Sequence, residues 1–391
     1  MIQLDEALEI ALNKAFVLDT ERIDYIESLG RILGEDIRSD INMPPFNKSA
    51  MDGYACRRED LSFELEVVET IRAGFVPEKS IVERQCASIM TGAILPEGAN
   101  CVIMVEHTKK SKDNKILFTK EKTKNNICYK GEDIKIGELV LKKGEKIKSQ
   151  HIAVMASLGC VKPQVYKQPK VGVIATGTEL VEPENKPGIS QIRNSNGSQM
   201  IAQLKALGIN PEYYGIAPDS EEKTFNIISD SLKENDVILL SGGVSMGEYD
   251  FVPKVLKKLG IELLFQKIAV KPGKPTTFGV NNKKYVFALP GNPVSSFIIF
   301  DLLVKPFLYK MMNKDTSQSI IKLPLEKRIE RKKAERLVWM PGKINNNGTV
   351  QVIDYHGSAH INSLTDADCI ISMKAGQLTI ESGELADVRQ I

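Results

Sequence analysis

The chain has few of the features on which metal-bound or disulfide-bonded folds depend. Its 391 residues include six cysteines, and no two of them form a Cys-x-x-Cys pair. This spacing argues against a zinc knuckle and a disulfide framework, and it predicts a reducing, cytoplasmic location. A dominant charge is also missing, because 52 basic residues oppose 50 acidic ones. With a net charge of +2, the surface has no overall field to attract nucleic acid.

Long hydrophobic runs are absent as well. The most apolar segment, residues 295–308, is broken by Asp301 and Lys305 and is too short to span a bilayer. Residues 1–16 place apolar side chains on one helical face and acidic ones on the other. This segment has no basic start and no continuous apolar core, so it is not a secretory signal. It predicts a helix that packs on its own protein or on a partner subunit, and we expect a soluble protein without membrane contact.

Two further patterns have simple explanations. The basic stretches 109–124 and 328–336 are interleaved with acidic, Asn or Ser residues, which favours a solvated hairpin and a connector over a nucleic-acid site. His356 and His360 have the four-residue spacing of a metal-binding pair on a helix. A Gly and a Ser follow His356, so a turn is expected there instead.

The most informative stretch is VILLSGGVSMGEYD, residues 237–250. An apolar strand ends on a glycine-rich loop, and a helical pattern begins at residue 251. Such a turn aims backbone N–H groups and the positive end of a helix at one point, which suits a phosphate. The carboxylates of Glu248 and Asp250 can hold a cation beside it. We therefore expect a phosphate and a metal at this loop.

Two similar loops follow other apolar strands. Residues 170–175 lead into TGTE (176–179), and residues 286–289 lead into PGNP (290–293), where the Asn and the second Pro suit the cap and first turn of a helix. Strands alternating with helices over residues 168–312 predict a parallel sheet covered on both faces. The three loops then meet at one crevice, outside the carboxyl ends of the strands.

Two helices fit between these strands, at residues 196–207 and 220–234. The second begins with acidic residues and has apolar ones at helical spacing. Its cap is Asp219 or Ser220, and a capping role for Asp219 competes with a role in the crevice.

The segment KPGKP, residues 271–275, lies between strand patterns at 263–270 and 276–280. Its prolines restrict the backbone, and its two lysines are three residues apart, so both can approach one small ligand. A lysine ammonium is a compact charge that suits a tetrahedral oxyanion. A solvated turn with two surface lysines is the alternative.

Seven motifs together resemble one family. They are PPFNKSAMDGYA (44–55), MTGAILPEGANCVIMVE (90–106), GEDIKIGE (131–138), TGTEL (176–180), SGGVSMGEYD (241–250), VKPGKP (270–275) and LPGNPVS (289–295). They are similar, in the same order, to motifs of the molybdopterin molybdenumtransferases, which include relatives of the E domain of gephyrin. The resemblance covers residues 1–391, and seven motifs in register are highly specific.

The resemblance implies a reaction and its participants. Adenylylated molybdopterin and molybdate would yield the metal-loaded cofactor, AMP and water, with Mg²⁺ bridging the pyrophosphate. It also implies a homodimer whose sites are shared between subunits, and possible contact with the molybdopterin adenylyltransferase.

Site residues follow from the match to the motifs, position by position. The implied catalytic residues are Asp52, Glu179 and Asp250. The implied substrate-binding residues are Thr91, Asp133, Asp219, Gly242, Gly243, Ser245, Gly291, Asn292 and Pro293. Molybdate is expected at Lys271, Lys274, Ser295, Arg336 and Ser358, and the metal at Glu179, Asp219 and Asp250. The chain departs from the family at Cys128, where Arg is common, and at Pro341, near a second common Arg.

The expected fold is multidomain α/β plus β, with a central three-layer α/β/α domain of the molybdopterin-binding type. The resemblance implies a discontinuous elongated domain (1–42 and 134–168), a β-rich domain (43–133), the α/β domain (169–315) and a small C-terminal β-barrel (316–391). Residues 1–42 are predicted to be mostly helical. Other patterns predict a strand at 63–71, a hairpin with its turn at Asp113-Asn114, and a helix at 149–158.

Two other functions compete with molybdenum insertion. The family's adenylyltransferase has a domain similar to residues 168–312, so adenylyl transfer from ATP is one alternative. The gephyrin E domain also anchors receptors, so a non-catalytic interaction module is another. The motifs SAMDGYA and MTGA, with the C-terminal domain, resemble only the insertase. The acidic and lysine positions needed for chemistry are all present, which favours an enzyme.

Overall fold

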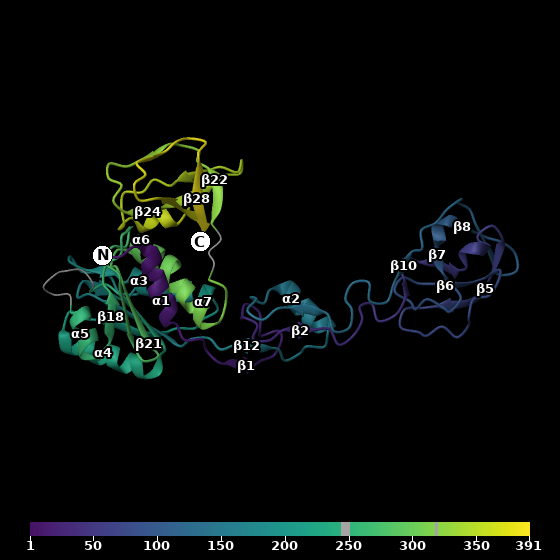
Figure 1. Cartoon of the computed structure of the whole chain (residues 1–391), viewed down its shortest axis with the longest axis horizontal. Coiled ribbons are helices and arrows are strands. Elements are labelled where there is room, and N and C mark those ends of the chain that lie inside the picture. Colours follow the sequence, from purple (N-terminus) through teal and green to yellow (C-terminus); the bar gives the residue numbers. More distant parts are fainter. Residues whose placement is uncertain (244–250, 317–319) are drawn as a thin grey trace. The chain divides into compact units, whose positions relative to one another are not determined.

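The computed structural model describes residues 1–243, 251–316 and 320–391. Glu248 and two predicted site residues, Ser245 and Asp250, lie outside this part of the chain. The chain divides into two compact units (Figure 1). The first contains Met1–Gly34, Gly144–Lys148 and Lys162–Ile391, and the second contains Glu35–Lys143 and Ser149–Val161. The four domain ranges stay a prediction, since this division is coarser.

A six-stranded sheet forms the centre of the first unit. Its order is β16 (Glu212–Ala217), β13 (Val171–Thr176), β17 (Val237–Ser241), β21 (Lys284–Leu289), β20 (Thr277–Asn281) and β18 (Glu262–Phe265). The first four strands are parallel, as predicted, but β20 and β18 each run antiparallel to their neighbours. The sheet is therefore mixed. A wholly parallel sheet was the wrong prediction because the turn at Asn282 and Lys283 returns the chain directly from β20 to β21.

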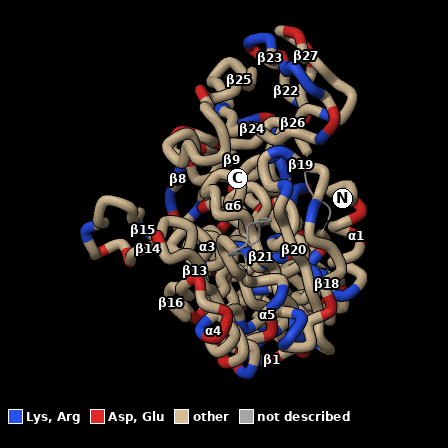
Figure 2. Tube along the Cα trace, turned by 90° about the vertical axis from the view of Figure 1, so that its left-hand side faces the viewer, with Lys and Arg blue, Asp and Glu red and all other residues tan. Residues whose placement is uncertain are grey.

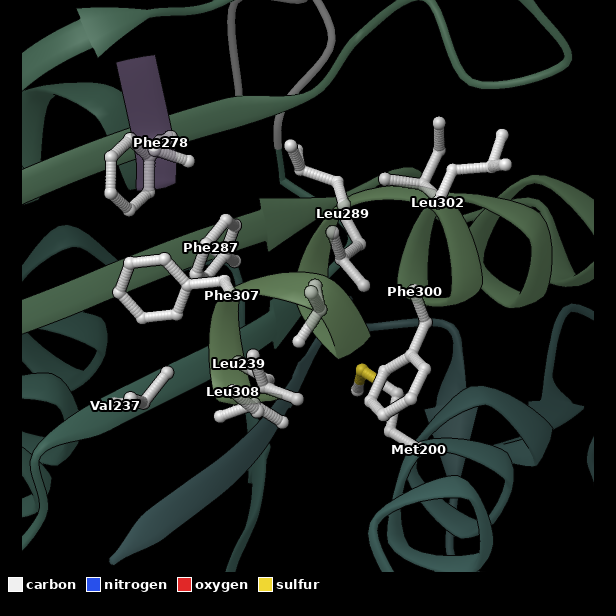
Figure 3. Close-up of a cluster of buried hydrophobic side chains, with 14 of the residues drawn as sticks. Met200, Val237, Leu239, Phe278, Phe287, Leu289, Phe300, Leu302, Phe307 and Leu308 are labelled. Atoms are coloured by element: carbon white, nitrogen blue, oxygen red, sulfur yellow. The ribbon is translucent and has the colours of Figure 1, made fainter. Parts of the chain in front are cut away.

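Helices cover both faces of this sheet, which confirms the three-layer arrangement. One face packs on α3 (Ser195–Ala206), α6 (Pro293–Ile299) and α7 (Lys305–Met311), and the other on α4 (Glu221–Glu234) and α5 (Val252–Lys258). Successive strand residues alternate between the faces, so Leu239 faces α7 while Leu240 faces α5. Figure 3 shows Phe278, Phe287 and Phe307 packed together on the first face.

The N-terminal helix α1 (Leu4–Lys14) packs on this first face, against α7. Its buried residues are Leu4, Ala7 and Ala11, so the predicted apolar stripe contacts its own chain. The Tyr285 hydroxyl donates a hydrogen bond to the carbonyl oxygen of Lys14 at 2.7 Å, which fixes the end of the helix.

The mostly helical prediction for residues 1–42 is wrong beyond α1. Within the first unit, β1 (Thr20–Arg22) pairs with β12 (Gln164–Tyr166). Within the second, β2 (Ile37–Arg38) pairs with β11 (Leu139–Leu141). Each of these strands pairs with a strand more than 100 residues away in the sequence, and local periodicity cannot predict such a pairing.

The C-terminal part of the first unit is all β, as predicted. Its main sheet follows the order β19 (Val270–Lys271), β24 (Leu337–Ile344), β26 (Cys369–Met373), β28 (Leu385–Gln390) and β22 (Ile321–Pro324), and β25 (Val350–Val352) pairs with β24. A short pair joins β23 (Ile329–Glu330) to β27 (Thr379–Ile380). The main sheet curls into a half-barrel.

The edge strand β19 comes from the α/β segment of the chain. The strand predicted at residues 263–270 therefore splits, with β18 in the central sheet and β19 in the C-terminal one. Val270 lies opposite Leu337 and Lys271 opposite Val338 in a parallel pairing with β24. This pairing places the start of the KPGKP segment on the C-terminal sheet.

The second unit is built on a mixed sheet with the order β7 (Cys101–Met104), β4 (Gly53–Cys56), β6 (Gln85–Ile89), β5 (Glu64–Ile71), β9 (Lys115–Phe118) and β8 (Thr108–Lys110). The predicted strand at 63–71 and the hairpin are confirmed, and Asp113 and Asn114 adopt positive φ values of 60° and 58° at its turn. A two-stranded pair, β3 (Lys48–Ser49) with β10 (Ile127–Cys128), and the predicted helix, α2 (Ser149–Ser157), complete it.

A buried ion pair joins the C-terminal sheet to the helices. Arg389 on β28 pairs with the carboxylate of Asp301, which lies in the π-helical turn Phe300–Val304 between α6 and α7. Arg389 also donates to the carbonyl oxygen of Asp301 at 2.5 Å, and Lys305 lies 2.7 Å from the same carboxylate. Arg389 and Asp301 are only 6% and 4% exposed. Removal of either residue would therefore leave the charge of the other buried without its main partner, which is costly.

We predict that Arg389→Met destabilises the C-terminal sheet by about 3–5 kcal/mol, the usual cost of breaking a buried pair. The only tryptophan, Trp339, is buried on β24 and reports on this sheet by fluorescence during urea unfolding. Lys305→Met is the control, since its more exposed ammonium should contribute at most about 1 kcal/mol. Equal, small effects of both substitutions would contradict this role.

Candidate functional site

The glycine-rich loop after β17 approaches a neighbouring strand too closely for any side chain. Gly242 and Gly243 have φ values of +91° and +65°. A Cβ atom on Gly242 would lie 2.6 Å from the carbonyl oxygen of Thr176, and one on Gly243 would lie 2.7 Å from a methyl carbon of Val252. Glycine is therefore required at both positions, and the loop packs directly on the end of β13.

The loop after β13 is tied to the loop after β16. The backbone N–H of Thr178 donates to the carboxylate of Asp219 at 2.9 Å, and the backbone N–H of Asp219 donates to the Thr178 hydroxyl at 3.1 Å. Helix α4 begins after Ser220, with no side-chain hydrogen bond at its cap. The cap position is thus Ser220 and not Asp219, and the role of Asp219 in the crevice stays a prediction.

Glu179 lies on the same loop, with its carboxylate beside Gly177. A Cβ atom on Gly177 would lie 2.5 Å from a carboxylate oxygen of Glu179. Glu179 and Asp219 both line one cleft. Carboxylate oxygens are the ligands that Mg²⁺ prefers, so these two residues fit a magnesium site. Across the described residues, no group of three potential metal ligands occurs, and Asp250 lies outside them.

Asn292 precedes α6 at the cap position, as predicted, but its side chain does not cap the helix. Its amide instead donates to the hydroxyl of Ser358 at 2.9 Å. The backbone N–H of Val294 donates to the carbonyl oxygen of Ser358 at 3.1 Å, which adds a second bond. The predicted cap bond is therefore wrong, because a residue 66 positions away competes for the amide.

Sequence reasoning missed Asn196. Its amide donates to the Ser241 hydroxyl at 2.7 Å and to the carbonyl oxygen of Gly291 at 2.8 Å, so it joins the ends of β17 and β21. Asn194 caps α3 by accepting from the backbone N–H of Gly197 at 2.9 Å. The signal was the pair of asparagines at the start of the predicted helix, where Asn commonly caps.

These loops enclose a cleft of about 700 Å³. It brings together the predicted residues Glu179, Asp219, Gly242, Gly243, Gly291, Asn292 and Pro293. Arg193 and the first residues of α3 line it too, which sequence reasoning did not predict. An arginine and a helix N-terminus both attract phosphate groups, so the cleft suits a phosphorylated ligand.

A second cavity of about 730 Å³ lies against the C-terminal sheet, and Figure 2 shows basic residues beside β19. Its cationic lining consists of Lys271, Arg331, Lys332, Lys333 and Arg336. Glu330 and Glu335 are the carboxylates of the lining. The guanidinium of Arg336 donates to the carbonyl oxygen of Val270 at 3.2 Å, which holds it beside Lys271.

Three other residues predicted for molybdate, Lys274, Ser295 and Ser358, line neither cavity. Lys274 is exposed, and Ser295 is buried at the start of α6.

Residues 355–361 separate the two cavities. Tyr355, His356 and Gly357 line the basic cavity, whereas Ala359 and Ile361 line the cleft. Ser358 lies between these groups and is held by Asn292. The segment contains a turn, as predicted, and the stacked rings of His356 and His360 have centroids 5.2 Å apart.

In the second unit, Asp52 and Thr91 form a pair. Thr91 donates to one Asp52 carboxylate oxygen from its backbone N–H at 2.7 Å and from its hydroxyl at 2.9 Å. These two bonds, the backbone one first, lower the pKa of the exposed Asp52 below its usual value. The carboxylate therefore stays charged at neutral pH.

The other predicted residues of the second unit have different surroundings. Asp133 is exposed, and its backbone N–H donates to the carbonyl oxygen of Met43 at 3.0 Å. Cys128, the departure from the family, lies opposite Lys48 in the pair of β10 with β3. Burial, followed by a hydrogen bond with Glu132, raises the pKa of the Cys128 thiol. Cys128 therefore does not supply the positive charge of the Arg that is common at this position in the family.

No helix in the described residues is long and apolar enough to cross a bilayer.

Comparison with known proteins gives matches along the chain. Residues 2–159 match the MoeA N-terminal region (domain I and II), residues 172–310 the probable molybdopterin binding domain, and residues 322–391 the MoeA C-terminal region (domain IV). The molybdopterin molybdenumtransferase of Staphylococcus epidermidis RP62A is 36% identical, with 99% of this chain and 95% of that protein aligned. The protein of the same name from Bacillus subtilis strain 168 is 34% identical, with 99% and 93% aligned.

A solved structure agrees with these matches. The crystal structure of the molybdopterin biosynthesis MoeA protein from Pyrococcus horikoshii OT3 is 31% identical, covers 100% of both chains and gives a TM-score of 0.86. The full-length similarity confirms the expected fold class and the resemblance drawn from seven motifs. The chain belongs to the molybdopterin molybdenumtransferase family.

Proposed function

We propose that this enzyme inserts molybdenum from molybdate into adenylylated molybdopterin and releases AMP. One observation carries the proposal. A cleft with carboxylates and glycine loops is separated by only one short segment, residues 355–361, from a cavity lined by Lys271 and Arg336. A phosphorylated substrate and a small oxyanion can therefore be bound in neighbouring places, as a transfer between them requires.

The cleft binds the pterin phosphate and the adenylate in this proposal. Arg193 and the backbone at the start of α3 contact phosphate oxygens, and Asn196 holds the two neighbouring loops in place. Glu179 and Asp219, with Asp250, would hold Mg²⁺, whose charge would offset that of the pyrophosphate. Asp133, which belongs to the second unit, would contact the same substrate from the partner subunit.

Molybdate binds through charge in this proposal. Lys271 and Arg336 attract the dianion in the basic cavity, and Lys274, three residues after Lys271, adds positive charge to the same segment. Ser295 is buried and lines neither cavity, so no contact with molybdate is proposed for it. Ser358 lies in the chain between residues that line the two cavities, so its hydroxyl is proposed to lie near the point where molybdate meets the pterin.

Asp52 acts in the cleavage step. Its lowered pKa makes it a poor proton donor and a weak base at neutral pH, so a charged role fits better. It would orient the attacking water or help to hold the cation. We further propose that the enzyme is a homodimer in which Asp52 and Thr91 of one subunit serve the cleft of the other. A molybdopterin adenylyltransferase would supply the substrate.

The proposed function is tested by incubating the purified protein with adenylylated molybdopterin, molybdate and Mg²⁺ in the absence of ATP. We expect release of AMP and molybdenum bound to the pterin, both dependent on molybdate. An adenylyltransferase would instead require ATP and molybdopterin, and an interaction module would release no AMP. Either of those results would overturn the proposal.

We predict that Asp52→Asn lowers the rate of AMP release by about a hundredfold or more, within the range for a group that acts in the transition state. Asparagine can still accept from Thr91, so folding and binding of the adenylylated pterin should be unchanged. Asp113→Asn, an exposed acid at the hairpin turn of the same unit, is the matched control. Release of AMP at the parent rate by Asp52→Asn would rule out this role.

Lys271→Ala and Lys274→Ala should each raise the molybdate concentration needed for half-maximal turnover by about tenfold or more, since a hydrogen bond to a charged group contributes about 1.5–3 kcal/mol. Binding of the adenylylated pterin should change little. Lys322→Ala removes an exposed lysine of β22, which lies at the opposite edge of the C-terminal sheet from β19, and serves as the control. If neither substitution changes the molybdate concentration needed for half-maximal turnover, the KPGKP segment is a solvated turn and the two lysines do not bind molybdate.

A further inference from the structure

Arg331 makes an unusual set of contacts at the wall of the basic cavity. Its guanidinium donates to three carbonyl oxygens, those of Gln377 at 2.6 Å, Arg336 at 2.7 Å and Lys374. All three acceptors are neutral backbone groups. In the described residues, no ion pair joins Arg331 to a carboxylate.

These contacts connect two separate segments of the C-terminal part. Gln377 and Lys374 belong to the turn between β26 and β27, whereas Arg336 immediately precedes β24. Two backbone bonds support the connection, from the N–H of Arg331 to the carbonyl oxygen of Leu378 at 3.0 Å and from the N–H of Gly376 to that of Ala334 at 2.7 Å. The guanidinium therefore holds the backbone of Arg336 from the side opposite to β19.

Arg336 in turn holds Lys271. Its side chain donates to the carbonyl oxygen of Val270, and Val270 and Lys271 pair with the start of β24. A continuous series of bonds thus runs from the turn at 374–377 through Arg331 and Arg336 to β19. Displacement of the Arg336 backbone would change the separation between the Arg336 guanidinium and the Lys271 ammonium, which both belong to residues that line the cavity.

We propose that Arg331 is a positioning residue for oxyanion binding, which sets the place of the Arg336 guanidinium relative to the Lys271 ammonium. This inference rests on the proposed function, since it concerns the same molybdate-binding cavity. A lysine cannot replace Arg331, because its single ammonium lacks the planar set of donors that reaches carbonyls on two segments. The positive charge alone is therefore not sufficient.

The inference is tested with Arg331→Met and Arg331→Lys in the molybdate-dependent release of AMP. Arg331→Met should raise the KM for molybdate by about tenfold, as for the loss of contacts to one charged group, with kcat at saturating molybdate within about twofold of the parent. Arg331→Lys should keep a KM raised by about threefold or more. Binding of molybdate alone, measured by calorimetry, should weaken in parallel.

Arg328→Met is the matched control. Arg328 lies three residues earlier, carries the same charge, pairs with the exposed Glu330 and Glu381, and does not line the cavity. It should leave the KM for molybdate within about twofold of the parent, because exposed pairs contribute little.

The possible results separate the roles. A merely structural Arg331 would lower the melting temperature and the active fraction but leave the KM for molybdate unchanged. Full restoration of KM by Arg331→Lys would show that only charge matters. Either result would overturn the inference while the parent still released AMP. If the parent binds molybdate but releases no AMP, the proposed function fails, and calorimetry on the variants still decides the role of Arg331.

Discussion

The cleft depends on the two hydrogen bonds made by the amide of Asn196. They hold the hydroxyl at the end of β17 and a carbonyl oxygen in the loop after β21, so both loops keep their places over the carboxyl ends of the strands. The side chain is 8% exposed, and in such surroundings an unpaired polar group costs more than a paired one contributes. Gly242 allows the close approach on the other side, where a Cβ atom would meet Thr176. The positions of the loops around the cleft thus depend on the hydrogen bonds of Asn196 and on the absence of a side chain at Gly242.

The proposed chemistry is divided among three parts of the chain. The cleft carries carboxylates and glycine-rich loops, the basic cavity is lined mainly by cations, and the second unit carries a carboxylate that its threonine partner keeps charged. Residues 355–361 keep the first two apart while Ser358 touches the cleft through Asn292.

Much of the α/β core could be predicted from the sequence, because short apolar runs followed by glycine loops are strong local signals. The ends of β13, β17 and β21 were predicted to meet at one crevice, and the loops that follow them line one cleft. Strand direction was harder to predict, since apolar spacing is the same in parallel and antiparallel strands, and the direction of β20 was therefore predicted wrongly. Contacts between residues far apart in the sequence could not be predicted either. Nothing near Asn292 indicates Ser358, and nothing near Val270 indicates a partner in β24.

The central claim is that residues of both units act in one reaction, contributed by two subunits of a dimer. Mixing two inactive proteins tests it most directly, with Asp52→Asn in one and Glu179→Gln in the other, after subunits have exchanged. If each site takes Asp52 from one subunit and Glu179 from its partner, half of the mixed dimers' sites are intact, and about a quarter of the parent activity returns, as random pairing predicts. If each site is built within one subunit, every site keeps a lesion and no activity returns. That second result, or a monomeric parent protein by light scattering, would contradict the account.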